Sequence, residues 1–313
     1  MTTRDASWTN ERERSSLWVL TLMRWIAVGL GRPAARLLLG PIALYFLLFA
    51  RRPSRASAQY LRQVFGRRPT FGERLRHIHG FASTVLDRVY LLQERFDGFD
   101  IRIEGTEHLD AVLARGEGAL LIGAHLGSFE VMRAFGSARS GLRIAMVMYE
   151  DNARMINATL KAIAPDTPLH IIALGHLESM LQLRSWLDDG GVAGLLGDRS
   201  LPGAAASREV SHRLPFLGAD ASFSDGPFRL AALLRRQIVF MTGLYLGGNR
   251  YSLRFLPLAD LSERPASREA QDAAVADAQR RYVAILEQLC REHPMNWFNF
   301  YDFWAPTDAD VAR

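Results

Sequence analysis

The chain has 313 residues, of which 49% are hydrophobic and 23% charged, and this is enough apolar material for a substantial core in one large or two small domains. The formal net charge is +5, and nearly all of the positive charge is arginine, since Lys161 is the only lysine. Arginine suits anionic membrane surfaces, phosphorylated lipids or an acidic carrier protein, although a biased base composition of the gene gives the same excess. No nucleic-acid partner is expected, because the sequence has neither zinc-type spacing nor a basic stripe with interleaved aromatics.

The N-terminal third contains two apolar segments, at residues 17–31 and 37–50. The second carries no charge but is shorter than the roughly 20 residues that a membrane-spanning helix needs. Arginines stand on both sides of it, and the nearby tryptophans and tyrosine suit a membrane interface. These features favour an interfacial helical hairpin, or a short tilted span with snorkelling arginines, over a pair of core helices. We therefore expect a membrane-associated segment at residues 1–55 and a separate domain at residues 56–313.

Patterns typical of strands and helices alternate along the rest of the chain. Short apolar runs predict strands, at residues 101–104, 118–123, 143–148, 169–173, 192–196, 238–246 and 251–255. Apolar positions at helical spacing predict helices, at residues 58–65, 71–96, 128–136, 153–162, 177–188, 227–236 and 268–293. This alternation predicts an α/β fold with a mixed central sheet flanked by helices. Cys290 is the only cysteine, so an internal disulfide and a cysteine-based metal site are excluded.

The most informative stretch is GAHLGSFE, at residues 123–130. His125 follows a predicted strand and Glu130 lies in the first turn of the next predicted helix, so both fall at the sheet edge where α/β proteins bind ligands. Across this turn, the carboxylate of Glu130 is expected to reach the imidazole of His125, which fixes the tautomer and raises the basicity of the other ring nitrogen. His125 can then take a proton from a hydroxyl or an amine.

Two other predicted strands also end in polar residues. Asp198 and Arg199 are expected beside His125, where Asp198 holds a catalytic group or a group of the acceptor substrate, and Arg199 binds a phosphate or a developing oxyanion. A surface turn with a local Asp–Arg pair is the alternative. Tyr149 and Asn152 are candidates for substrate binding at the end of another strand, and a polar surface turn accounts for them equally well.

The His-x4-Glu motif and its companions resemble a known family. The companions are Met148-Tyr-Glu-Asp-Asn152, Gly197-Asp-Arg-Ser200, Leu214-Pro-Phe-Leu-Gly218 and the aromatic stretch Asn296-Trp-Phe-Asn-Phe-Tyr-Asp-Phe-Trp304. Together they resemble the bacterial lipid A biosynthesis (lauroyl/myristoyl) acyltransferases, within the lysophospholipid and glycerolipid acyltransferase superfamily, over residues 60–304. Glu150 departs from the family pattern, which often has arginine there, and this puts the usual contact with an acceptor phosphate in doubt.

The resemblance implies transfer of a fatty acyl chain from acyl carrier protein or acyl-CoA to a hydroxyl or amine of a membrane lipid. It also implies a location at the cytoplasmic face of the inner membrane, and it requires no cofactor or metal. His125 oriented by Glu130 is then the base, while backbone N–H groups after Gly127, with Arg199, stabilise the oxyanion. Three alternatives stay open: an acyltransferase of a specialised lipid or polyene pigment pathway, a lipid ester hydrolase that uses Ser128, and a non-catalytic membrane scaffold.

Overall fold

The computed structural model describes residue 29 and residues 31–139, 142–149, 170–199 and 211–305. Its centre is a seven-stranded sheet with the order β1-β9-β8-β2-β5-β3-β4. The strands are β1 (Asp100–Glu104), β2 (Leu120–Gly123), β3 (Ile144–Tyr149), β4 (His170–Leu174), β5 (Val192–Leu196), β8 (Gln237–Tyr245) and β9 (Arg250–Asp260). Neighbouring strands are parallel except β8 and β9, which pair antiparallel. The predicted mixed α/β sheet is confirmed.

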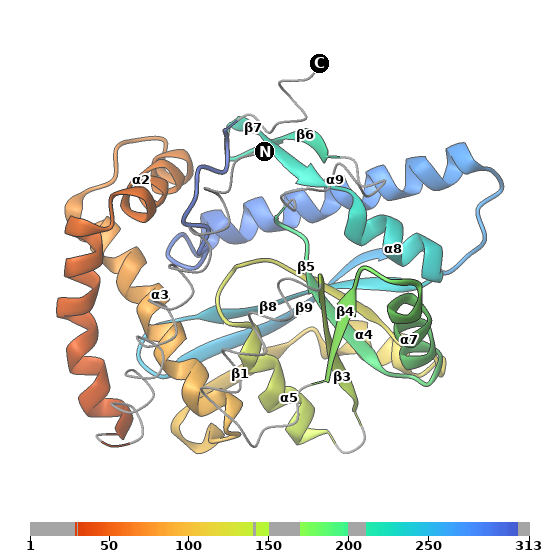
Figure 1. Ribbon diagram of the computed structural model, residues 1–313, viewed down its shortest axis with the longest axis horizontal. Helices are drawn as coiled ribbons and strands as arrows, with labels where there is room; N and C mark the ends of the chain where they lie inside the picture. Colours follow the sequence, from red (N-terminus) through yellow and green to blue (C-terminus); the bar gives the residue numbers. More distant parts are fainter. Residues whose placement is uncertain (1–28, 30, 140–141, 150–169, 200–210, 306–313) are drawn as a thin grey trace, which may run out of the picture.

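Helices cover both faces of this sheet (Figure 1). They are α2 (Arg51–Phe65), α3 (Phe71–Leu92), α4 (Thr106–Leu113), α5 (Met132–Ala138), α7 (Leu177–Asp188), α8 (Gly226–Leu234) and α9 (Arg268–Glu292), with short 3₁₀ turns η1 (Phe96–Gly98) and η2 (Phe129–Val131). Alternate residues of each central strand point to opposite faces, as the pleat requires. In β2, Leu120 and Ile122 join the core cluster under α8 and α9, while Leu121 joins the cluster that α4 and α5 cover.

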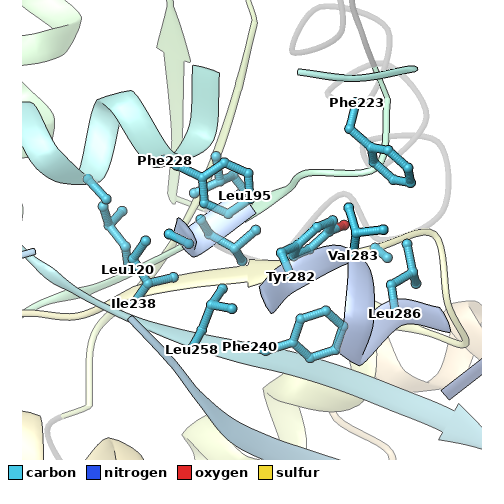
Figure 2. Packing of buried hydrophobic residues seen from close by; sticks show 14 of the residues in the cluster. Leu120, Leu195, Phe223, Phe228, Ile238, Phe240, Leu258, Tyr282, Val283 and Leu286 are labelled. Carbon is cyan, nitrogen blue, oxygen red and sulfur yellow. The ribbon is translucent and has the colours of Figure 1, made fainter. Parts of the chain in front are cut away.

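The larger core cluster is centred on α9, as Figure 2 shows. Tyr282 of α9 is fully buried between Phe228 of α8 and Phe240 of β8, with ring centroids 5.5 Å from each. Its hydroxyl donates to the carbonyl of Gly123, the last residue of β2, at 2.9 Å. The long C-terminal helix therefore supports the strand end that precedes His125.

The N-terminal apolar helix occupies residues 31–49 and lies beside α3, in red and orange in Figure 1. Its buried residues, Ala35, Leu39, Ala43 and Leu47, repeat every four positions and contact apolar side chains of α3. The opposite face remains apolar and exposed, with Leu37 at 80% and Phe49 at 67% of full exposure. By length and composition, this is the one helix among the described residues that could cross a membrane.

The arginines at the start of this helix point into the protein. Arg32 pairs with the buried Asp87 of α3 at 2.7 Å, and Arg36 donates to the hydroxyl of Tyr245 at 3.0 Å. These two side chains therefore do not extend toward lipid headgroups, as the option of a short span with snorkelling arginines would require. Residues 37–49 contain no charged side chain, so the exposed face of the helix over this stretch is wholly uncharged.

Several elements differ from the predictions. Strands β6 (Ser211–Phe216) and β7 (Ala219–Ser224) form an antiparallel hairpin, and α4 is a helix, where the sequence predicted neither. Helix α2 is longer than predicted and continues across residue 55, the expected boundary between the two segments. The predicted helix at residues 153–162 lies outside the described residues. The two-segment division itself stays a prediction.

The aromatic C-terminal segment, residues 296–304, crosses the carboxyl edge of the central strands, and we call it the strap. Asn296 accepts a hydrogen bond from the N–H of Gly127 at 2.8 Å, and Phe298 donates its N–H to the carbonyl of His125 at 2.7 Å. The side chain of Asn296 also bonds both backbone groups of Tyr245 at the end of β8. The strap is thereby fixed against the loop that carries His125.

Candidate active site

The site forms where the neighbouring parallel strands β2 and β5 end together. Gly123 and Leu196 are opposite each other in the register, so the two residues that follow each strand also come close. His125 Nδ1 lies 2.8 Å from Asp198 Oδ1, and the backbone N–H of His125 donates to Asp198 Oδ2 at 3.0 Å. The carboxylate thus holds both the ring and the backbone of His125, although the two residues are 73 positions apart.

Asp198 is 1% exposed, and the strap supplies the rest of its hydrogen bonds. The indole N–H of Trp297 and the amide of Asn299 donate to Oδ2 at 2.9 and 2.8 Å. Burial by itself raises the pKa of this carboxyl, but the adjacent imidazole, its hydrogen bonds and Arg199 together hold the pKa below its ordinary value. Asp198 is therefore an ionised carboxylate at neutral pH, and both of its oxygens accept hydrogen bonds from groups of the protein.

This arrangement settles the tautomer of His125. A carboxylate only accepts hydrogen bonds, so Nδ1 carries the proton and Nε2 has the lone pair. The side chain of His125 is 27% exposed, which leaves it open to a substrate. The ring is therefore prepared to take a proton at Nε2, and the resulting imidazolium is stabilised by Asp198.

Glu130 lies elsewhere than the sequence analysis expected. Its Oε1 is 2.6 Å from Nε of Arg88 on α3, and its Oε2 accepts from the hydroxyl of Ser128 at 2.8 Å. The carboxylate on the imidazole is that of Asp198, so the expected Glu130–His125 contact is replaced. Glu130 fastens the loop after His125 to α3, and a catalytic role for it stays a prediction.

The loop between His125 and η2 approaches β8 through two glycines. Gly127 has a φ of +75°, and a Cβ there would lie 2.0 Å from the carbonyl oxygen of Gly243. The N–H groups of Gly127 and Ser128 already donate to Asn296 and Gly243. These two N–H groups are therefore engaged within the protein, and an oxyanion site at the N–H groups that follow Ser128 stays a prediction.

Of the other residues predicted to bind substrate, the structure describes Arg199 and the backbone of Tyr149 but not Asn152. Arg199 is exposed next to Asp198; its Nε donates to Asn299 at 2.8 Å, and its guanidinium stands 5.5 Å from the centre of the Tyr301 ring. Tyr149 ends β3, two strands from β2, and Asn152 lies outside the described residues. Binding of substrate by any of these residues stays a prediction.

The strap is the part of the site that the sequence analysis did not resolve. Its aromatic density indicated a place near the site, but nothing local shows that Trp297 and Asn299 donate to Asp198. The described residues contain no group of three or more His, Cys, Asp and Glu side chains that could hold a metal ion. The expectation of a reaction without metal or cofactor stays a prediction.

A mixed α/β sheet whose central strands end in a histidine hydrogen-bonded to a buried carboxylate has the side chains needed to activate a hydroxyl or an amine. The sequence model of the bacterial lipid A biosynthesis acyltransferases matches residues 6–305. The chain belongs to this family and is an acyltransferase. A comparison with curated proteins found no significant match.

Proposed function

We propose that this acyltransferase moves a fatty acyl chain from an acyl thioester, on acyl carrier protein or coenzyme A, to a hydroxyl or amine of a membrane lipid in lipid A-type biosynthesis. The observation that carries the proposal is the hydrogen bond from His125 Nδ1 to the buried carboxylate of Asp198. It leaves Nε2 unprotonated on a partly exposed ring, as a general base requires.

In the proposed reaction, His125 accepts one proton from the acceptor and later donates one proton to the leaving thiolate. His125 Nε2 takes the proton of the acceptor as its oxygen or nitrogen attacks the thioester carbonyl, and the new acyl bond forms. Collapse of the tetrahedral intermediate breaks the carbon–sulfur bond, and the imidazolium returns the proton to the leaving thiolate. Arg199 follows Asp198 in the chain and is exposed, so its positive charge is suited to stabilising the oxyanion or binding an acceptor phosphate.

The competing hydrolase needs a serine nucleophile at the histidine. Ser128 is the nearest in sequence, but it is 2% exposed and its hydroxyl donates to Glu130. The Ser128 hydroxyl thus hydrogen-bonds to a carboxylate and not to the imidazole, and it is shielded from solvent. These contacts favour direct transfer to an external acceptor over an acyl-enzyme.

We further propose that the exposed face of helix 31–49 rests in the cytoplasmic leaflet of the inner membrane. The helix is about 28 Å long, at 1.5 Å for each of its 19 residues. It nevertheless contacts α3 along most of that length, so a transverse span would carry α3 into the bilayer too. Exposed Arg51, Arg52 and Arg55 follow directly and suit anionic headgroups. This supports an interfacial helix over a span.

The test is acyl transfer by membranes that contain the protein. Radiolabelled long-chain acyl carrier protein or acyl-CoA is offered with total bacterial lipid, and the labelled lipid product identifies the acceptor. His125→Ala should lower the rate by at least about 10³-fold, because the base is lost. His108→Ala, at a partly exposed histidine of α4, is the matched control and should be unchanged. Equal rates for wild type and His125→Ala, or label released only as free fatty acid, would overturn the proposal.

A further inference from the structure

His77 of α3 lies under the segment that holds Asp198 and has no part in the mechanism above. The side chain is fully buried. Its Nε2 is 2.9 Å from the carbonyl oxygen of Trp297, and its Nδ1 is 2.8 Å from the hydroxyl of Ser57 on α2. Aromatic rings surround it, with centroids at 5.2–5.8 Å, from Tyr60, Phe298 and Phe300. Because burying a polar imidazole among aromatic rings is costly unless its nitrogens are hydrogen-bonded, these two hydrogen bonds are the features of His77 that need an explanation.

The two partners fix the state of His77. A backbone carbonyl only accepts, so Nε2 carries the proton and donates to Trp297. Nδ1 then accepts, and the Ser57 hydroxyl donates to it. Burial lowers the pKa of His77 to about 4, which agrees with a neutral ring at physiological pH. His77 is thus a neutral donor held in one tautomer by Ser57.

The residue that receives this hydrogen bond is also the one that holds the catalytic pair. Trp297 donates its indole N–H to Asp198 at 2.9 Å. Its backbone forms a β-bridge with Leu126, and the next residue, Phe298, donates to the carbonyl of His125. A shift of Trp297 therefore moves both the carboxylate partner and the loop that bears the base.

We propose that His77 is a positioning residue that acts through Trp297 to keep Asp198 and His125 in register. This rests on the proposed role of His125 as the base. A chain of hydrogen bonds runs from Ser57 through His77, Trp297 and Asp198 to the imidazole of His125. His77 holds the backbone carbonyl of Trp297, and the indole of the same residue donates to Asp198, so the strap is held by α2 and α3 on one side and by Asp198 on the other.

The test compares three purified full-length variants. His77→Leu fills the space but removes the donor to Trp297. His77→Gln is the rescue variant, because its amide can still donate there. Val89→Ala, at a buried position of α3 that contacts helix 31–49 and not the strap, is the control for loss of stability alone.

His77→Leu should lower kcat at least about tenfold with KM little changed, since misplacement of the base affects the chemical step. The acid limb of its pH–rate profile should move to lower pH, because a carboxylate held less closely stabilises the protonated imidazole less. The charged and titratable groups around the pair, Arg199, Tyr282 and Tyr301, are the same in every variant. His77→Gln should restore most of kcat, and Val89→Ala should lower thermal stability and leave kcat and the profile unchanged.

The inference is overturned if folded His77→Leu keeps the kcat and pH profile of the wild type, or if Val89→Ala loses kcat in the same proportion. Loss in His77→Leu without rescue by His77→Gln would also overturn it, since the donor would not be the cause. If His125→Ala is inactive while His77→Leu is fully active, only the positioning role fails. If His125→Ala is active, the proposed function fails first.

Discussion

At the scale of single residues, the carboxylate that orients the imidazole of His125 is Asp198, and substitutions of Asp198 and Glu130 distinguish the two acidic candidates. Asp198→Asn keeps the size and an oxygen acceptor but removes the charge that favours Nδ1–H on His125. We expect kcat to fall about 10³-fold or more, as follows from a wrong tautomer and a lost counter-charge. Initial rates of acyl transfer measure this, with thermal unfolding to verify the fold.

Glu130→Gln is the matched comparison. It breaks the ion pair with Arg88 but keeps an acceptor for Ser128, so the base stays oriented. We expect a much smaller loss than in Asp198→Asn. A larger loss in Glu130→Gln would restore the dyad that the sequence motif indicated and would contradict the assignment made from geometry.

Buried His77 also predicts how stability depends on pH. Its pKa in the folded state is about 4, below the ordinary value of 6.5, so between these values the unfolded chain binds more protons than the folded one. The contribution of neutral His77 is complete above pH 6.5 and is lost as the pH falls to 4. At about 1.4 kcal/mol per pH unit, the loss is roughly 3 kcal/mol.

Urea unfolding of the wild type and of His77→Gln at pH 7, 5.5 and 4.5 measures this effect. The midpoint of the wild type should drop more steeply with acid than that of the variant, because glutamine does not titrate. Parallel curves would show that other groups dominate acid unfolding.

At the scale of elements, the site depends on how closely the catalytic loop approaches β8. A Cβ on Gly243 would lie 2.2 Å from the carbonyl oxygen of Ser128 and 3.2 Å from Cβ of Val131. Gly243→Ala must therefore push the loop away from the sheet, at a cost of about 1–3 kcal/mol in the free energy of unfolding. Because His125 shares that loop, kcat should fall by an order of magnitude or more.

Gly72 of α3 provides the control for this prediction, because apart from the adjacent residues and backbone of its own helix no atom lies within 4 Å of its added Cβ. Gly72→Ala should leave kcat unchanged and raise stability by up to about 1 kcal/mol through helix propensity. Denaturant midpoints measure the stability of the two variants, and initial rates of acyl transfer measure their kcat. Wild-type activity in Gly243→Ala would mean that the loop adjusts without moving the base.

The elements themselves were predictable to the extent that their patterns are local. Strand β5 and helix α7 begin and end where the apolar run and the helical spacing predict. Strand β6 was missed because exposed Arg213 and His212 and the internal Pro215 conceal the alternation that marks a strand. The hairpin exists because buried Phe216 packs against Trp297 of the strap, a contact between distant segments.

The same limit applies to the site. His125 and Asp198 were both chosen from the sequence, because each follows an apolar run at the carboxyl edge of a strand. Which carboxylate meets the imidazole depends on β2 and β5 being neighbours, and no local spacing encodes that pairing. Glu130 is only five residues away, yet the turn at Gly127 directs it toward Arg88 on α3.

At the scale of the whole molecule, α3 connects the apolar face to the catalytic loop. Adjacent residues of this helix hold the two parts: Asp87 binds Arg32 of helix 31–49, and Arg88 binds Glu130. The hydroxyl of Tyr251 on β9 also donates to Asp87, so the sheet is fixed to the same point. The distance between the apolar face and His125 is therefore set by one rigid helix, which suits an acceptor that stays in a lipid layer.

This arrangement predicts that the exposed apolar face of helix 31–49 contributes a large share of the affinity for membranes, in addition to the arginines that follow it. Replacing Leu37, Tyr45 and Phe49 with serine changes side chains that are 80, 59 and 67% exposed, so the fold should persist. At about 1.5 kcal/mol or more for each large apolar side chain buried, binding to anionic vesicles should weaken by on the order of 10³-fold. The matched control replaces Leu177, Leu181 and Leu233 of α7 and α8, which are 72, 60 and 66% exposed on other helices. Co-sedimentation of the folded proteins with vesicles measures both, and equal binding of the two triple variants would show that helix 31–49 does not rest in the bilayer.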